Sequence, residues 1–506
     1  MIDLREYQSR GVDMTREELK RFNSVCLVIP PGGGKTRIAA AICERVVMNE
    51  KQALFIPPRR ALVTQSHAAF EALGLRSGIY MAGMEFDPRH KIDIASIDTI
   101  TSRIEKEYSQ GRELLKTASV IFFDEGHVYA SKERAALIND IRTGVYGPKK
   151  KIILLTGTPC TGSGGGLGNI CEKLIVPVTM RELIDQGYLL QPRYFSAPMP
   201  DLSHVKKSGD DLNQKQLGEA YDKPKIVGSV VENWLRIAPG TSTVVFAPTR
   251  ANATHLAEQF EAVGVKTAYV DALTDNDERD EIFEKIQQGE IQVVCNVLVI
   301  GMGVDLPRLE TVVFATKTKS VTRWVQGVCR PDRPWGDQKF YTVIDHGGMY
   351  DDPNLGAVED IADWDLAPKQ KVQDRIEKRK KENKELKEIK CPKCPAIFKA
   401  AHRCPRCGYQ LKQKSEPLDY YEADLQEMKP IHDKFTKDEK QKFYSELLTI
   451  CDRNKYNSGW IANTYRKRFN VWPSGMKDVA IEPSRSTKQY VGILLRKYYE
   501  NKRRVA

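Results

Sequence analysis

A glycine-rich loop near residue 30 restricts the possible folds of this chain more than any other feature. Residues 29–36 read Ile-Pro-Pro-Gly-Gly-Gly-Lys-Thr, and they lie between an apolar run at 25–29 and a stretch of helical spacing at 37–47. Glycines in such a loop let backbone N–H groups converge on a phosphate at the N-terminus of the following helix. A strand, this loop and a helix in succession predict an α/β domain with a parallel sheet that binds a phosphorylated ligand.

The residues of the loop have the groups that a nucleoside triphosphate needs. The three glycines are Gly32, Gly33 and Gly34. Lys35 can reach the β- and γ-phosphates, and the hydroxyl of Thr36 can bind Mg²⁺. A glycine-rich turn without a ligand is the alternative, but the agreement of strand, loop, Lys-Thr pair and helix disfavours it. The loop therefore predicts an ATP site with these five residues around the phosphates.

Two carboxylates follow a second apolar run. Residues 121–127 read Ile-Phe-Phe-Asp-Glu-Gly-His, about ninety residues after the loop. The C-terminal end of a strand in a parallel sheet faces the ligand crevice, where Asp124 can hold Mg²⁺ and Glu125 can polarise the attacking water. An Asp-Glu pair after a strand is common, and its position downstream of a phosphate loop makes it specific. His127, taken alone, is more often a structural histidine.

Short aliphatic runs alternate with longer helical stretches between residues 20 and 365. The expected strands form two series, at 25–29, 53–56, 92–96, 120–123 and 152–156, and at 243–246, 267–270, 293–297, 311–315 and 340–344. Strands that alternate with helices form parallel sheets through crossover connections. The fold class is therefore α/β, with two tandem parallel-sheet domains at 1–185 and 186–366. A glycine-rich loop at 161–168, just before the join, is expected to be mobile.

The motifs of residues 1–345 resemble those of superfamily 2 helicases of the DExH type, which implies that both sheet domains are RecA-like. Residues 4–8 resemble the element that recognises adenine, so Arg5 and Gln8 are expected to bind ATP. Residues 156–159 read Thr-Gly-Thr-Pro and resemble motif III, which couples hydrolysis to domain movement. The resemblance assigns this coupling to His127, Thr156 and Thr158.

The resemblance also assigns contacts with nucleic acid to motifs that follow strands in both domains. The expected contacts in the motor are Arg59, Arg60, Gln65, Ser96, Thr99, Thr249 and Arg250. Residues 296–307 resemble motif V, in which Gly303 and Asp305 would bind the nucleotide near its ribose.

A final motor motif is expected to act on the γ-phosphate. Residues 326–333 match the pattern Q-x-x-G-R-x-x-R, except that Cys329 replaces glycine. Charge develops on the phosphoryl oxygens during transfer, and an arginine supplied across a cleft can stabilise it. Gln326, Arg330 and Arg333 are therefore candidate catalytic residues, with Arg333 as the expected finger.

Four of the eleven cysteines form a cluster beyond a charged linker at 367–390. The cluster consists of two Cys-Pro-x-Cys pairs, Cys391 with Cys394 and Cys404 with Cys407. Thiolates at this spacing predict a closed tetrahedral Zn²⁺ site with a structural role, in a ribbon at 391–412. A redox dithiol is the alternative, and two symmetric pairs disfavour it. Whether the ribbon contacts nucleic acid or braces the next domain stays open.

The last third of the chain is strongly basic. Residues 367–506 contain 34 Lys and Arg against 18 Asp and Glu, a net charge of +16, whereas residues 1–366 have a net charge of −5. A basic appendage on a nearly neutral body favours a polyanionic partner. The domain at 413–506 is expected to be small, mostly helical and nucleic-acid-binding, with contacts from Arg466, Lys467 and Arg468.

Aromatic residues interleave with these charges at Trp460, Tyr465, Phe469 and Trp472. Exposed rings could stack on unpaired bases. Their spacing of five, four and three residues fits one side of a helix, so we favour the alternative in which they form the core of a helical module and the charges lie outside.

These features together predict an ATP-dependent DNA helicase or translocase that uses Mg²⁺. The whole is similar to phage and bacterial helicases of the RecG/UvsW kind, which implies work on branched DNA in replication and recombination. A helicase subunit of a restriction system, an RNA helicase and an ATP-gated clamp remain alternatives. No apolar run approaches the roughly 18 residues of a membrane span, and seven cysteines are scattered singly. We therefore expect a cytoplasmic protein, bacterial or in a phage-infected host, without a membrane partner.

Overall fold

The structure is a computed structural model of the whole chain. It describes residues 2–104, 109–162, 164–196, 202, 205–208, 211–222, 224–271, 273–297, 308–352, 354–361, 364–367, 388–390, 397–399, 426–427, 436–456, 458–469 and, with single gaps, 473–494. Among these residues no helix is both long and apolar enough to cross a membrane. The chain divides into two compact units. The first comprises residues 1–189, 320–329 and 352–415, and the second comprises 190–319, 330–351 and 416–506.

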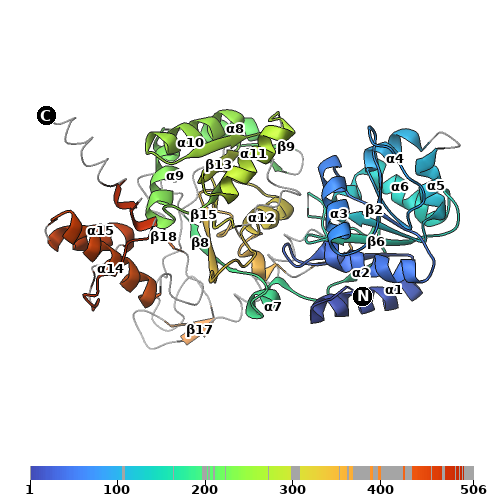
Figure 1. Cartoon of the computed structure of the whole chain (residues 1–506), viewed down its shortest axis with the longest axis horizontal. Helices are drawn as coiled ribbons and strands as arrows, with labels where there is room; N and C mark the ends of the chain where they lie inside the picture. Colours follow the sequence, from blue (N-terminus) through green and yellow to red (C-terminus); the bar gives the residue numbers. More distant parts are fainter. Residues whose placement is uncertain are drawn as a thin grey trace. The chain divides into compact units, whose positions relative to one another are not determined.

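The first unit is built on a sheet of seven parallel strands in the order β3-β4-β2-β5-β6-β1-β7. Two of its strands, β2 and β6, are labelled in Figure 1. The strands are β1 (Ser24–Val28), β2 (Ala53–Ile56), β3 (Gly78–Tyr80), β4 (Ile92–Ala95), β5 (Val120–Asp124), β6 (Lys151–Thr156) and β7 (Lys173–Ile175). The central strands are buried almost throughout, as expected for a sheet covered on both faces. All five strands that the sequence predicted for this unit are confirmed; β3 and β7, of three residues each, were not predicted.

Helices cover both faces of this sheet. The helices of the unit are α1 (Glu6–Arg21), α2 (Lys35–Met48), α3 (Arg60–Ala72), α4 (Ile97–Arg103), α5 (Gln110–Thr117), η1 (Gly126–Ala130), α6 (Lys132–Thr143), α7 (Met180–Asp185), α12 (Val321–Val328) and η3 (Val358–Asp360). On one face α4, α5 and α6 contribute Ile100, Leu115 and Ile138 to a core with alternate strand residues. On the other face Phe70 of α3 packs on Phe55 of β2, with ring centroids 5.4 Å apart. Two short antiparallel strands, β16 (Glu388–Lys390) and β17 (Ile397–Lys399), belong to the same unit.

The second unit has a sheet of the same kind, in the order β12-β13-β11-β14-β15-β8-β18. Its strands are β8 (Gln191–Ser196), β11 (Thr243–Phe246), β12 (Thr267–Val270), β13 (Val293–Asn296), β14 (Thr311–Phe314), β15 (Phe340–Asp345) and β18 (Gln426–Glu427), with a separate hairpin of β9 (Lys207–Ser208) and β10 (Asp211–Leu212). All pairs in the sheet are parallel except β8 with β18. The five strands that the sequence predicted here are confirmed, and β8 was missed.

The helices of the second unit are α8 (Gln214–Tyr221), α9 (Pro224–Ile237), α10 (Arg250–Ala262), α11 (Asn276–Gln287), α14 (Lys437–Arg453) and α15 (Ser458–Phe469). On one face of the sheet, α9 and α10 form a core in which Trp234 meets Phe260 edge to face at 5.4 Å. The indole of Trp234 also donates a hydrogen bond of 2.7 Å to the hydroxyl of Thr243, which satisfies its buried N–H. A smaller core joins α14 and α15 around Leu447 and Tyr465.

Candidate functional site

The candidate active site lies at the carboxyl edge of the first sheet. Strands β5, β6 and β1 are neighbours in that sheet, so the residues that follow them must meet at one edge. The phosphate loop follows β1, Asp124 ends β5 with Glu125 directly after it, and Thr156 ends β6. The sheet topology therefore brings together three motifs that are up to about 130 residues apart in the chain.

The phosphate loop ends in a helix whose N-terminus has no side-chain cap. Gly34 is the N-cap of α2 in the left-handed conformation, with φ 81° and ψ 41°, and it makes no side-chain cap hydrogen bond. Gly32 also has a positive φ of 71°. Uncapped N–H groups at a helix N-terminus, with the positive end of the helix dipole, form an anion site. Lys35 and Thr36 are the first residues of this helix, which begins two residues before the helical stretch that the sequence predicted.

Glu125 contacts several of the other side chains at this edge. It has a positive φ of 48°, a strained conformation for a non-glycine residue that is common at functional sites. Its carboxylate lies 3.3 Å from Nζ of Lys35, and both side chains are 17% exposed. Nδ1 of His127 lies 3.4 Å from Oε2 of Glu125, and Nε2 of Gln326 donates to the same oxygen at 3.5 Å. Three predicted site residues thus surround the predicted water-orienting group.

Burial shifts the pKa values of two side chains at this edge, Asp124 and His127. Desolvation, together with the neighbouring charge of Glu125, raises the pKa of Asp124 to about 7. A carboxyl group with an environment of this kind favours a divalent cation, because the cation supplies the charge that stabilises the ionised form. Desolvation lowers the pKa of His127, so its ring is neutral at pH 7.

A chain of polar contacts leads from Glu125 to the end of β6. Nδ1 of His127, which lies near Glu125, is 2.9 Å from the hydroxyl of Thr156. The same hydroxyl accepts a hydrogen bond of 3.1 Å from the backbone N–H of Thr158. Thr156 and Thr158 are fully buried. The three residues to which the sequence analysis assigns coupling therefore form one connected group with the carboxylate of Glu125.

A recess of about 310 Å³ lies beside the phosphate loop, and Arg5, Gln8 and Gly34 line it together with Asp3 and Arg37. The Gln8 amide has a fixed orientation, because its oxygen accepts from the backbone N–H of Arg5 at 3.0 Å and its nitrogen donates to the carbonyl of Gly33 at 3.3 Å. The recess is where the sequence places the adenine base.

Two tyrosines that the sequence analysis missed support this recess. The hydroxyl of Tyr7 donates to the carbonyl of Gly33 at 2.9 Å, and the guanidinium of Arg5 lies 4.3 Å from the ring centroid of Tyr188. Tyr7 is adjacent to Gln8 in the sequence, which was an available signal. Tyr188 is about 180 residues away and had none.

Cys329, the departure from the final motor motif, has a packing explanation. Its side chain is 5% exposed, and its sulfur lies 4.0 Å from the sulfur of Met180 at the start of α7. A thiol behaves here as a small apolar group, so a glycine is not required at this position. Arg330 is half-buried and Arg333 is exposed; both belong to the second unit.

The expected nucleic-acid contacts of the motor separate into surface and interior groups. Arg59, Arg60 and Gln65 are exposed at the start of α3, and Thr249 caps α10 by accepting from the N–H of Asn252. Arg250 is 56% exposed and pairs with Asp271 at 2.9 Å.

Two of these expected contacts need correction. The side chains of Ser96 and Thr99 are 2% and 3% exposed. The hydroxyl of Thr99 accepts a hydrogen bond of 3.0 Å from the backbone N–H of Ala82. These side chains are structural and do not present a surface to nucleic acid.

Arg468 also differs from the expectation. Its guanidinium lies 4.4 Å from the ring centroid of Phe443 and 5.3 Å from that of Tyr490, so it is part of the aromatic core of α14 and α15 and not of a basic surface. Tyr465 is buried, and Trp460 and Phe469 pack against the same core, which confirms the packing interpretation of these rings. Trp472 lies outside the described residues.

Several predicted site residues cannot be placed. Gly303, Asp305, Cys391, Cys394, Cys404 and Cys407 lie outside the described residues, as do the side chains of Arg466 and Lys467. Among the residues that the structure describes, no three or more His, Cys, Asp or Glu side chains come together in a group that could hold a metal ion.

Two protein families match the chain. Residues 1–161 match the family described as "Type III restriction enzyme, res subunit", and residues 223–334 match the "Helicase conserved C-terminal domain". The chain therefore has one region that matches each of these two families, and the phosphate loop and the Asp-Glu pair lie in the first of them. These are the two regions from which superfamily 2 helicases are built, in agreement with the resemblance of the motifs.

Known proteins are similar over part of their length. A "51.5 kDa protein" of Lactococcus phage (isolate 7-9) is 26% identical over 317 residues, which are 63% of this chain and 64% of the phage protein. A candidate ATP-dependent helicase of Saccharomyces cerevisiae, IRC3, is 22% identical over 408 residues, 74% of this chain and 58% of that protein. The chain therefore spans less than two thirds of the length of these relatives.

Solved structures support the fold. A fragment of a candidate HsdR subunit of a type I restriction enzyme from Vibrio vulnificus is similar with a TM-score of 0.54 and 17% identity, over 73% of this chain and 68% of that one. The Type ISP restriction-modification enzyme LlaBIII gives a TM-score of 0.51 and 16% identity, over 68% of this chain and 27% of that one.

Proposed function

We propose that the protein hydrolyses Mg-ATP to move along DNA and to unwind or remodel branched DNA in replication and recombination. The observation that carries the proposal is the edge of the first sheet, where Lys35, His127 and Gln326 gather around Glu125 beside an uncapped helix N-terminus. The net charge of +16 in residues 367–506 supports a polyanionic track.

In the proposed mechanism the N-terminus of α2 and Lys35 bind the β- and γ-phosphates. Thr36 and Asp124 would hold Mg²⁺, which supplies positive charge against the phosphate oxygens when it is bound. Glu125 orients the attacking water, and Gln326 fixes the carboxylate of Glu125. Arginines of the second unit, Arg330 and Arg333, would stabilise the charge that develops on the γ-phosphoryl group.

Coupling to movement would use the polar chain that begins at Glu125. Nδ1 of His127 lies close both to the carboxylate of Glu125 and to the hydroxyl of Thr156, so a shift of the carboxylate on hydrolysis would change the contacts of β6. Arg59, Arg60 and Gln65 on α3, with Thr249 and Arg250 on α10, are the proposed contacts with DNA. Arg466 and Lys467 would add phosphate contacts.

A structural zinc ion in residues 391–412 is part of the proposal. Strands β16 and β17 pair in antiparallel fashion, with Ile389 opposite Phe398, and the residues that connect them include Cys391 and Cys394. A hairpin that brackets a Cys-x-x-Cys pair fits a zinc knuckle. Native mass spectrometry should find one zinc ion per chain, and changing Cys391 and Cys394 to Ser together should remove it. An iron–sulfur absorption band, or a protein without metal, would contradict this assignment.

A helicase subunit of a restriction system is the second candidate. It is favoured by the match of residues 1–161 to a restriction-enzyme family. A subunit that moves along duplex DNA without separating its strands would give a different product from that of a branched-DNA helicase.

An unwinding assay separates these functions. The full-length protein, ATP and Mg²⁺ are combined with forked DNA, four-way junctions, tailed duplexes and RNA hybrids of equal length. The proposal predicts that forks and junctions are separated fastest, and that Lys35→Ala abolishes the reaction. ATP-dependent displacement of a triplex strand from duplex DNA, without unwinding of any substrate, would favour the restriction translocase. Preference for RNA hybrids would favour an RNA helicase. Hydrolysis of ATP without strand displacement or translocation would favour an ATP-gated clamp.

A further inference from the structure

The segment from Leu355 to Ala367 belongs to the first unit, although it follows β15 of the second sheet in the chain. We call residues 355–367 the return segment; 362 and 363 lie outside the described residues. Leu355, Val358 and Ile361 are 3%, 1% and 7% exposed, and Trp364 packs against the core that includes β5 and β6. A segment with this much apolar burial is a structural part of the unit and not a loose linker.

The return segment is bonded to the glycine-rich loop that follows Thr158. The N–H of Gly166 donates to the carbonyl of Ala367 at 3.1 Å, and the N–H of Gly168 donates to the carbonyl of Leu366 at 2.8 Å. Leu167, between the two glycines, is fully buried. The mobility that the sequence predicted for 161–168 is therefore wrong at these residues, because a distant segment fixes the loop.

The two glycines are required by this close approach. A Cβ atom at Gly168 would lie 2.5 Å from the carbonyl oxygen of Leu366, and a Cβ at Gly166 would lie 2.2 Å from that of Asp365. Both obstructing atoms are backbone, which cannot rotate away as a flexible side chain does. A methyl group at either glycine must displace the return segment.

Two further anchors connect the return segment to helices. The indole N–H of Trp324, on α12, donates to the carbonyl of Gly356 at 2.8 Å. The guanidinium of Arg181, on α7, lies 2.6 Å from the carboxylate of Asp360. Trp324 precedes Val325 and Gln326, so the anchored turn of α12 is the turn that carries the contact with Glu125.

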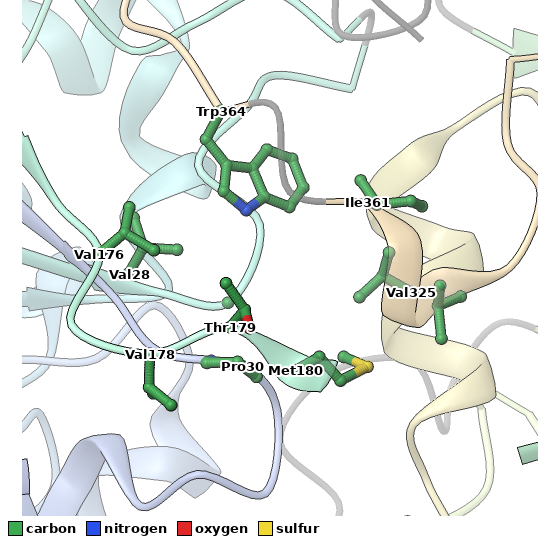
Figure 2. A pocket seen from close by; sticks show the side chains of 11 residues that line it. Val28, Pro30, Val176, Val178, Thr179, Met180, Val325, Ile361 and Trp364 are labelled. Carbon is green, nitrogen blue, oxygen red and sulfur yellow. The ribbon is translucent and has the colours of Figure 1, made fainter. Parts of the chain in front are cut away.

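A small apolar cavity shows how closely these parts pack (Figure 2). Its side chains include Val28 and Val176 on one side, Val325 and Ile361 on another, and Trp364 at the top of the view. The cavity holds about 30 Å³, roughly the space of one or two water molecules and far less than an organic ligand needs. The cavity lies where the strand before the phosphate loop, α12 and the return segment pack against one another.

We propose that the return segment is a positioning strap for ATP hydrolysis. It fixes α12, and with it Gln326, against Glu125 by means of Trp324, and it fixes the loop after Thr158 by means of Gly166 and Gly168. The contact between Gln326 and Glu125 is 3.5 Å, at the long end for a hydrogen bond, so a small displacement of α12 breaks it. The strap rests on the proposed function, since it acts on the hydrolysis that this function assigns to Glu125.

Gly168→Ala in the full-length protein tests the strap, with Gly492→Ala as the matched control because a Cβ at Gly492 meets no atom within 4 Å. Misplacement of a catalytic group by about 1 Å can cost about 100-fold in rate. We expect Gly168→Ala to lower kcat for DNA-stimulated ATP hydrolysis by at least about tenfold, with the Kd for ATP within about twofold of wild type. Gly492→Ala should match wild type in both.

A double-mutant cycle shows whether the effect passes through Gln326. Gln326→Ala should lower kcat by itself, and adding Gly168→Ala to it should lower kcat by much less than it does in the wild-type background. An unchanged kcat in Gly168→Ala, a parallel loss of kcat, ATP binding and thermal stability, or full additivity in the cycle would each overturn the strap. Absence of ATP hydrolysis by the wild-type protein would instead overturn the proposed function, and the strap with it.

Discussion

The two sheets have corresponding strand orders but different chemistry at their carboxyl edges. The order β3-β4-β2-β5-β6-β1-β7 in the first unit matches β12-β13-β11-β14-β15-β8-β18 in the second, position by position. In the first unit the strands at three adjacent positions are followed by the phosphate loop, the Asp-Glu pair and the Thr-Gly-Thr motif. In the second unit the corresponding strands β8, β14 and β15 have none of these sequences after them.

At the carboxyl edge of the second sheet, the carboxylate at the end of β15 forms hydrogen bonds within its own turn. The carboxylate of Asp345, at the end of β15, accepts from the N–H groups of Gly347 and Tyr350 at 2.9 and 2.8 Å. His346 is 3% exposed, and burial lowers its pKa to about 4. At the first edge, by contrast, Lys35 and the Asp124–Glu125 pair lie beside the uncapped N-terminus of α2, and the backbone of Glu125 has a strained conformation. The fold sets where residues meet, and the residues after the strands decide whether the edge is catalytic.

The largest effect that separates the two edges is expected for Glu125→Gln. This change keeps the shape of the side chain but removes the charge that orients water, so ATP hydrolysis should fall roughly 10²- to 10⁴-fold. ATP binding should persist, because Lys35, Thr36 and Asp124 are unchanged. Steady-state hydrolysis and nucleotide titration measure both quantities, and Glu133→Gln on the exposed side of α6 is the control. Turnover near the wild-type value would remove Glu125 from the mechanism.

A smaller effect is expected from Gly34→Ala at the phosphate loop. Gly34 has φ 81°, and a Cβ there would lie 2.6 Å from Nε2 of Gln8. A left-handed conformation costs a non-glycine residue about 1–2 kcal/mol, and the contact with Gln8 adds to this cost. We expect ATP affinity to fall by about one to two orders of magnitude.

Gly74→Ala is the matched control for that change. Gly74 has nearly the same φ of 80° but open space around it, so it reports the backbone strain alone. Equal losses of ATP affinity in the two variants would show that the contact between Gly34 and Gln8 does not shape the site.

The smallest effect concerns the second edge, where His346 is expected to influence stability and not catalysis. Its pKa is about 4 when folded and about 6.5 when unfolded. The unfolded state therefore binds more protons, and stability falls as the pH falls below 6.5. Between pH 7 and pH 5 this residue should cost about 2 kcal/mol. Urea unfolding of wild type and His346→Phe at both pH values measures it: the variant should lose less stability on acidification, and an equal loss would contradict the buried neutral state of His346.

Much of this architecture could be predicted from the sequence, because strand periodicity and motif order are local signals. The strands from β1 to β15 that carry apolar, β-branched runs were predicted to within about two residues. β8 was missed because its sequence, Gln-Pro-Arg-Tyr-Phe-Ser, is polar and contains a proline. The positions of Gln8, Lys35 and Glu125 around the phosphate loop could be predicted because each belongs to a motif with a defined spacing.

The remaining features depend on contacts between distant parts of the chain. Nothing near Gly166 and Gly168 shows that a segment almost 200 residues later would pack on them, so a glycine-rich stretch predicted mobility. Ser96 and Thr99 follow a strand, as contact residues do, and only the fold shows that they face inward. Arg468 belongs to a basic run, but the rings of Phe443 and Tyr490 that surround it come from two other segments of the chain.

The most direct test of the account is the ATP hydrolysis rate of the full-length protein with increasing DNA. An active site at the first edge, in a motor that moves on DNA, predicts slow hydrolysis without DNA and a rate that rises with DNA to saturation. Lys35→Ala should abolish hydrolysis under both conditions, which excludes a contaminating ATPase. A wild-type rate that is zero, or one that DNA does not change, would contradict the central claim that this edge hydrolyses ATP to drive movement along DNA.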